Sequence, residues 1–232
     1  MRTFAMPPTV YAELAVSSHD TTRLATATFD NVRVQTATPP PPAPSVKEIV
    51  LYAPDAPAVT GTWRLEPDST AAVGKRAWNP DAGTAKVVTA AANPSGYVEF
   101  TFDAEAGRPY RLWIRGKAER DDGYNDSAHV QFSGSVDAQG APVYRIATTA
   151  SAEYNLESCR GCGLADWGWE DNGWGVDVAG PAIYFAAAGT QRIRIQNRED
   201  GLSFDQVVLS GDRFLNAAPG PAKLDRTIVQ KN

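Results

Sequence analysis

The stretch that decides the fold is QRIRIQNREDGLSFDQVVLS, Gln191 to Ser210. In Gln191–Gln196 two isoleucines alternate with two arginines, and Ser203–Leu209 repeats the pattern with β-branched residues. Alternation of apolar and polar residues is typical of a β-strand that is buried on one face. The polar residues Arg198–Gly201 separate the two stretches. This region therefore predicts two strands of a sheet.

The same period of two extends over most of the chain. The other candidate strands are Ile49–Tyr52, Tyr97–Phe102, Tyr110–Arg115, Ala128–Phe132, Val143–Ala147, Trp174–Val178 and Ala182–Phe185. Many short strands separated by Gly, Asn, Asp and Pro are typical of a sandwich. We therefore expect an all-β fold.

Composition excludes some classes of function. The 232 residues are 43% hydrophobic and carry a formal net charge of −5, which is typical of a soluble globular chain with an ample core. A negative chain is a poor partner for a phosphate backbone. No apolar run approaches the roughly 20 residues of a membrane span. We expect neither a nucleic acid nor a membrane as partner.

Motifs spread along residues 46–212 carry a family resemblance. They are IVLYAPDA at Ile49–Ala56, DSTAAVGK at Asp68–Lys75, YRLWIRGKA at Tyr110–Ala118, NDSAHVQF at Asn125–Phe132 and the Gln191–Ser210 stretch. In order and spacing they resemble the galactose-binding-like β-sandwiches, which include carbohydrate-binding modules of the family 6 and 35 type and malectin-like domains. The resemblance implies a jelly-roll β-sandwich, non-catalytic glycan binding, and often a structural calcium ion (Ca2+).

The positions that match the calcium site of those modules are Asp55, after the first strand, and Asp205, in the last. Asp205 shares a strand face with Val207 and Leu209, and a carboxylate beside core residues needs a cation or a partner. Calcium binds six to eight oxygens, and Asp68 is a weaker third candidate. The alternative for Asp205 is an ion pair with an arginine such as Arg198.

The segment CRGCGLADWGWEDNGWG, Cys159–Gly175, combines tryptophan with glycine and acidic residues. Exposed aromatic rings in polar company suit the apolar faces of sugar rings. The candidate carbohydrate-binding residues on this and a second loop are Trp167, Trp169, Trp174, Asn172, Tyr124, Asp121 and Asn125. We expect at least one of the three indoles, first of all Trp174, to be buried instead. The two loops could meet at one rim.

Trp113 lies in mid-strand between Arg111 and Arg115. Its face is either a binding surface, with an arginine for a uronic acid carboxylate, or the second buried face of an inner strand.

The two cysteines, Cys159 and Cys162, are spaced closely enough for a disulfide, which we expect in an oxidising compartment. A zinc site would need two further ligands, and the only histidines are His19 and His129.

The N-terminal part looks like a piece of another domain. Met1–Thr9 lack the features of a secretory signal. Leu14–Val34 resembles the closing strands of a concanavalin-like jelly-roll domain, so residues 1–35 are expected to be a fragment whose strand edges could dock on a neighbouring domain or another copy. Residues 36–45, with four consecutive prolines, predict a linker. Residues 213–232 are expected to form a loosely packed tail or linker.

No nucleophile elbow, phosphate loop or paired-histidine motif occurs, so we expect no enzyme. The sequence predicts a carbohydrate-binding module of a secreted, extracellular or cell-surface multidomain protein, with a polysaccharide or oligosaccharide as ligand. The alternative is a structural or adhesive module with the same sandwich and no glycan.

Overall fold

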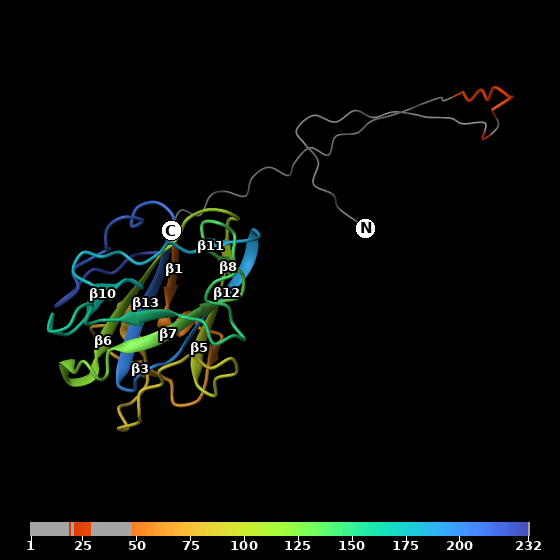
Figure 1. Ribbon diagram of the computed structural model, residues 1–232. Helices are drawn as coiled ribbons and strands as arrows, with labels where there is room; N and C mark the ends of the chain where they lie inside the picture. Colours follow the sequence, from red (N-terminus) through yellow and green to blue (C-terminus); the bar gives the residue numbers. More distant parts are fainter. Residues whose placement is uncertain (1–18, 20, 29–47, 232) are drawn as a thin grey trace. The chain divides into compact units, whose positions relative to one another are not determined.

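The computed structural model describes residues 19, 21–28 and 48–231 (Figure 1). The chain divides into two units, residues 1–43 and 44–232. The described residues of the first unit are exposed, and residues 21–28 contain no strand. The remaining predictions for residues 1–45, the strands and the proline linker, lie outside the described residues.

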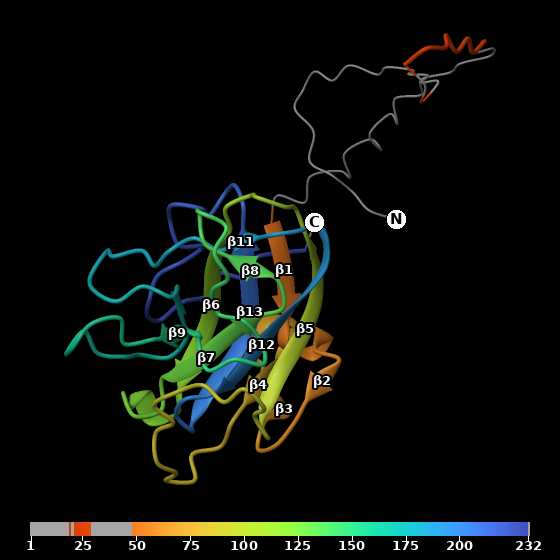
Figure 2. The same ribbon diagram turned by 45° about the vertical axis from the view of Figure 1, so that its right-hand side comes forward.

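The second unit is a β-sandwich, which can be followed in Figures 1 and 2. Sheet A has the order β10-β6-β13-β4-β3, with β1 also paired to β13, and sheet B has the order β2-β5-β12-β7-β9. The strands of sheet A are β1 Glu48–Tyr52, β3 Arg64–Pro67, β4 Lys75–Trp78, β6 Arg111–Ala118, β10 Gly168–Glu170 and β13 Leu202–Ser210. The strands of sheet B are β2 Ala58–Val59, β5 Tyr97–Ala104, β7 Ser127–Phe132, β9 Ala152–Asn155 and β12 Gly189–Asn197.

A small third sheet pairs β8, Ser135–Val136, with β11, Tyr184–Phe185. Three short 3-10 turns complete the described elements: η1 Ala53–Asp55, η2 Ala72–Gly74 and η3 Glu119–Asp121. The prediction of an all-β jelly-roll β-sandwich is confirmed.

The core lies between the two sheets because each central strand turns its alternate apolar residues inward. Leu112 and Ile114 of β6 are buried in the same cluster as Ile193 and Ile195 of β12. Phe185 makes edge-to-face contacts with three other rings, at centroid distances of 5.5, 5.8 and 6.0 Å. The period of two in the sequence therefore located the inward face correctly.

Strand β13 is the centre of sheet A. It pairs along its whole length with β6, and on its other side with β4 at its start and with β1 at its end. The register shifts between Phe204 and Gln206, so that Asp205 sits in a β-bulge. A bulge re-aims a side chain, and Asp205 accordingly contacts Arg115 of β6 instead of the apolar core.

The C-terminal segment, which we define as residues 213–231, covers the outer face of sheet A. Phe214 and Val229 are buried in a second cluster with residues of β1, β6, β10 and β13. Gln206 exchanges hydrogen bonds with the backbone of Val229, at 2.7 and 3.1 Å. The expectation of a loosely packed tail is therefore wrong: the segment supplies the third layer that the apolar outer face of sheet A requires.

Two predicted strands are absent from the described residues. In Val143–Ala147, Tyr144 and Ala147 have φ values of 50° and 70°, which no extended strand allows. In Trp174–Val178, a turn closes with a hydrogen bond of 3.1 Å from the Val178 amide to the Gly175 carbonyl. The period of two therefore predicted strands at two places where the backbone turns.

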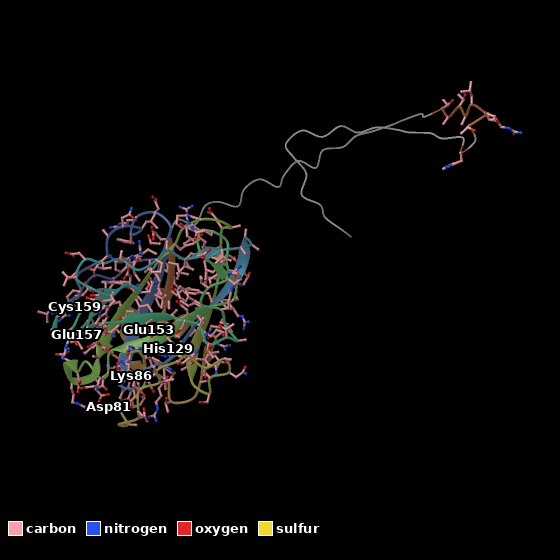
Figure 3. All side chains as sticks on the ribbon, viewed as in Figure 1. Asp81, Lys86, His129, Glu153, Glu157 and Cys159 are labelled. Carbon is pink, nitrogen blue, oxygen red and sulfur yellow. A yellow bond between two sulfur atoms is a disulfide. The ribbon has the colours of Figure 1, made fainter. Side chains whose placement is uncertain are left out.

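Loop residues 79–92 lie against the outer face of sheet B. His129 of β7 is buried, and its two ring nitrogens lie 2.8 Å from the Val87 carbonyl and 2.9 Å from the Ser151 hydroxyl. Burial lowers the pKa of His129. Figure 3 labels His129 with Lys86 and Glu153 on this side of the body. These polar groups pair with neighbouring side chains and with the loop backbone, so the loop covers this part of the face of sheet B.

Candidate functional site

The tryptophan-rich segment joins sheet A. Strand β10 pairs with β6 so that Trp169 lies opposite Arg115. Trp167 and Trp169, two residues apart, point to the outer face of the sheet, where they are 0% and 1% exposed. The prediction that both indoles stand open to solvent is therefore wrong.

Partners from distant parts of the chain explain why these indoles are buried. The Trp167 indole N–H donates to the Thr70 hydroxyl at 2.8 Å, and the Trp169 indole N–H donates to the Thr227 carbonyl at 3.2 Å. The Arg115 guanidinium lies 4.8 Å from the Trp167 ring centroid. A buried indole usually has such a partner for its N–H, and nothing in the local sequence reveals these two.

Trp113 is buried on the same outer face, where its indole N–H donates to the Phe214 carbonyl at 2.7 Å. Its alternative reading, the second buried face of an inner strand, is confirmed. The arginines beside it are also engaged: Arg111 with Asp171, and Arg115 with two aspartates.

Among the described residues, Trp174 and Tyr124 are the exposed aromatics, at 57% and 81%. The expectation that Trp174 is the buried indole is wrong, because the turn at residues 175–178 carries it out of the sheet. Val176 and Val178 of this turn are also exposed. We call these three exposed apolar residues, Trp174, Val176 and Val178, the apolar edge.

A cavity of about 630 Å³ opens beside this edge. Its floor is sheet A and the end of β9, and its walls are the loops around the disulfide, the turn at residues 175–179 and part of the C-terminal segment. The residues that matter most for its chemistry are Trp113, Trp169, Glu170, Asp177, Asn216 and Lys223. The cavity thus combines the apolar side chains of the turn and a small exposed part of Trp113 with carboxylate, amide and ammonium groups.

Asp171 fixes the shape of the turn. Its buried carboxylate accepts the amides of Gly173 at 2.6 Å and Gly180 at 2.8 Å, and Arg111 lies 3.5 Å away. Both positions require glycine, because a Cβ on Gly173 would lie 2.1 Å from the Val178 carbonyl oxygen and one on Gly180 would lie 2.5 Å from Asn172.

Among the titratable groups that line the cavity, Glu170 has a raised pKa. Burial raises its pKa to about 7, and the charge of Asp171 acts in the same direction. A hydrogen bond with Ser158 and the charge of Lys223 act against this rise. Glu170 therefore holds a proton readily near neutral pH, when it can donate as well as accept a hydrogen bond.

The disulfide between Cys159 and Cys162 is present, as predicted. The Lys223 ammonium donates to the Cys162 carbonyl, and the Gly163 amide donates to the Glu157 carboxylate at 2.9 Å. The disulfide therefore lies at the base of one wall of the cavity, and the contact of Lys223 connects this wall to the C-terminal segment.

The two predicted loops do meet: the Asp166 amide donates to the Asp121 carboxylate at 2.9 Å. Asn125 is buried, and its side-chain amide donates to the Glu119 carbonyl at 3.1 Å and to the Asp81 carboxylate at 3.2 Å. Asn172 donates to the Pro181 carbonyl at 3.3 Å. Neither Asn125, Asn172, Asp121 nor Tyr124 lines the cavity.

The three predicted calcium ligands do not come together. Asp205 contacts Arg115, Asp55 contacts Lys231 at 2.7 Å, and Asp68 lies 3.6 Å from Arg76. Arg198, the arginine suggested for Asp205, pairs with Glu153 at 3.1 Å. Within the described part of the chain, no group of three or more His, Cys, Asp or Glu side chains is placed to hold a metal ion. The predicted residues do not fit a calcium site.

Sequence reasoning missed the C-terminal part of the site, Asn216 and Lys223, because a segment rich in Ala, Pro and Gly carries no strand or helix pattern. Glu170 had a weak signal in its position beside Trp169. Among the described residues, no helix is long and apolar enough to cross a membrane.

No protein-family model matches the chain, and no curated protein matches its sequence. Solved structures do resemble it. A GH26-CBM35 β-(1,4)-mannanase from Podospora anserina is 14% identical with a TM-score of 0.45, over 72% of this chain and 28% of that chain. A family 35 carbohydrate-binding module from Clostridium thermocellum is 14% identical with a TM-score of 0.39, over 70% of this chain and 98% of that chain.

The C-terminal family 6 carbohydrate-binding module of a marine laminarinase from Zobellia galactanivorans is 11% identical with a TM-score of 0.41, over 70% of this chain and 98% of that chain. These similarities, at 14% identity or less, concern the fold and not the ligand.

Proposed function

We propose that the chain is a non-catalytic carbohydrate-binding module that holds an oligosaccharide segment in the cavity between the disulfide loop, the turn at residues 175–179 and the C-terminal segment. The observation that carries the proposal is the cavity itself. Its volume of about 630 Å³ lies within the range of roughly 300–1,000 Å³ that is typical of sites for small ligands.

The chemistry of the lining supports a sugar. Sugar rings present C–H faces and hydroxyl edges, so they need apolar surface and hydrogen-bonding groups at the same place. The apolar turn with Val176 and Val178 and the small exposed part of Trp113 provide the first, and Glu170, Asn216 and Lys223 provide the second. Trp174 does not itself line the cavity, but it is exposed next to the lining residue Gly175, which supports a contact with a sugar unit at the mouth.

The charges favour neutral glycans over uronic acids. Arg111 and Arg115, the arginines near the site, already pair with aspartates. The lining contains three carboxyl groups, of Glu170, Asp171 and Asp177, and one lysine, Lys223. Because Asp171 is paired with Arg111 and Glu170 readily holds a proton near neutral pH, a uronate would meet no surplus of positive charge.

The test is binding of the purified chain to a panel of neutral and uronate-containing oligosaccharides, measured by isothermal titration calorimetry. We expect saturable binding of at least one neutral glycan and none of the matched uronates. Binding confined to uronates would contradict the charge argument, and no binding to any glycan would contradict the function.

Two substitutions locate the site. Trp174→Ala and Asn216→Ala should weaken binding by at least several-fold without changing the unfolding midpoint. Val88→Ala is the matched control for Trp174, because Val88 is an exposed apolar residue on the loop that covers sheet B. Equal affinity of all three variants would place the ligand elsewhere.

One observation favours a second function. The burial of Trp167 and Trp169 removes two of the aromatic platforms that the sequence suggested, which supports a structural or adhesive module without glycan binding. The exposed edge of Trp174, Val176 and Val178 would then contact a protein. The glycan panel separates the two functions.

We also propose that the module belongs to a secreted multidomain protein. The disulfide supports an oxidising compartment. Recovery of the native protein from culture supernatant, with both cysteines blocked to thiol reagents, is the expected result.

A further inference from the structure

Each carboxylate predicted to hold calcium has a basic side chain beside it. Arg115 contacts Asp205, Lys231 contacts Asp55 at 2.7 Å, and Arg76 lies 3.6 Å from Asp68. The three pairs differ in depth: Lys231 is about half exposed, whereas Arg115 and Asp205 are both fully buried. The pair at Asp205 therefore matters most for stability, because a buried charge is costly unless an opposite charge lies beside it.

Arg115 connects three parts of the chain. Its Nη1 donates to Asp205 in the bulge of β13, its Nε donates to the Asp225 carboxylate at 2.6 Å, and its Nη2 donates to the Asp225 carbonyl at 3.2 Å. Asp225 belongs to the C-terminal segment and is also fully buried. A planar guanidinium suits such a set of donors, since it presents its N–H groups in a fixed fork.

The surroundings leave little room for another cation. The Oδ2 atom of Asp205 also accepts the Ala72 amide at 2.6 Å. The Trp167 ring lies 4.8 Å from the Arg115 guanidinium carbon and packs over the cation. Of the carboxylate oxygens of Asp205 and Asp225, only Oδ1 of Asp205 lacks a hydrogen-bond partner. One such oxygen is far from the six to eight that calcium binds.

We propose that Arg115 serves as the built-in cation of this fold, in the position where related sandwiches are expected to hold calcium. It neutralises the bulge carboxylate and ties β6 and β13 to the C-terminal segment. The stability of the domain is therefore independent of calcium and depends on Arg115. The cost of this arrangement is that the cation comes from the chain and cannot be exchanged.

The first test compares unfolding of the whole chain in excess EDTA and in millimolar calcium. We expect the same midpoint in both, and no saturable heat when calcium is titrated into EDTA-treated and dialysed protein. A midpoint that falls in EDTA and recovers with calcium would overturn the proposal.

The second test removes the cation. Arg115→Met keeps much of the length of the side chain, leaves Asp205 and Asp225 without their partner, and should lower the urea midpoint markedly. Arg192→Met is the matched control, since Arg192 is 47% exposed in its pair with Glu99, and it should leave the midpoint unchanged. An Arg115→Met midpoint equal to that of the control would overturn the proposal.

If Arg115→Met does not fold, the unfolding midpoint of Asp225→Asn tests the same proposal. It removes one negative charge and weakens the contact to the C-terminal segment. We expect a lower midpoint that is equal in EDTA and in calcium. A wild-type midpoint for Asp225→Asn would show that this contact does not tie the segment to the sheet.

Discussion

Tryptophan side chains in this protein differ in where their indole N–H finds a partner. Those of Trp113, Trp167 and Trp169 reach partners contributed by segments far away in sequence. Trp174 lies on a turn and stays exposed. The sequence shows the same glycine-rich, acidic neighbourhood for Trp167, Trp169 and Trp174, so it could locate the region of the site but not the exposed ring.

Replacement of these tryptophans by alanine should distinguish the buried side chains from the exposed one by their effect on stability. Trp169→Ala should cost about 3–5 kcal/mol in the free energy of unfolding, because it leaves a large cavity and an unpaired carbonyl. Trp174→Ala should stay within about 0.5 kcal/mol of wild type. Urea denaturation followed by circular dichroism measures both, and equal losses would contradict the assigned burial.

A buried acid pair predicts a pH dependence. Burial raises the pKa of Asp126 from 3.8 to about 8, and its hydrogen bond with Glu199 acts in the same direction. The pKa of Glu199 is lowered: hydrogen bonds from Lys86, Ser127 and Asp126 outweigh its own burial. The two carboxyl groups therefore share one proton in the folded state.

Because the folded pKa of Asp126 lies above the unfolded value, its contribution to stability is full below about pH 4 and is lost as the pH rises to about 8. Asp126→Asn keeps the donor to Glu199 and has no proton to lose. Relative to wild type, this variant should gain stability steadily between those pH values. Chemical denaturation at several pH values checks this, and a difference that does not change with pH would contradict the shared proton.

At the scale of elements, strands in which apolar and polar residues alternate strictly could be predicted, whereas short strands within loops could not. The ranges of β5, β7, β12 and β13 follow from the pattern of apolar residues, because the core takes up alternate residues of these strands. β10 has only three residues and gains its place by pairing with β6, an interaction between distant segments. The C-terminal segment has no period at all and is held by Arg115, Gln206 and Trp169.

The disulfide loop should matter more for the site than for the fold. Replacing both cysteines, Cys159→Ser with Cys162→Ser, frees a loop of only a few residues, which costs about 2 kcal/mol at most in the chain-entropy account. We expect the affinity for the glycan to fall several-fold, because the wall that Lys223 contacts loosens. Titration and unfolding of the same variant measure both quantities.

A reducing agent provides the control for this variant. It should reproduce the loss of affinity in wild type and change nothing further in the double serine variant. Unaltered affinity after reduction of wild type would show that the wall does not need the bridge.

At the scale of the whole molecule, charge distinguishes the classes of partner. The net charge of −5 provides no surplus of positive charge to displace counterions from a nucleic acid, and this displacement supplies most non-specific affinity. We expect no shift of DNA or RNA in gel electrophoresis at physiological salt. A shift that weakens with added salt would reveal a basic surface and contradict the expectation.

The sandwich as a whole was the most predictable feature, since its period, turn residues and motif order agree. The location of the site was only partly predictable, because the cavity arises from three segments that are brought together by the fold. Its polar groups Glu170 and Lys223 are 53 positions apart in the chain, and no spacing rule links them.

The C-terminal segment has a mechanical consequence. Its contacts with the sheet follow one another in order along the chain: Lys231 to Asp55, Val229 to Gln206, Thr227 to Trp169, Asp225 to Arg115, and Lys223 to the Cys162 carbonyl. A force applied to the chain beyond residue 231 would therefore act on these contacts one after another, beginning with the contact of Lys231. Tension from that side would break the contact of Asp225 with Arg115 before it reached Lys223 at the wall of the cavity, so loosening of that wall would follow the loss of the contact that ties the segment to the sheet.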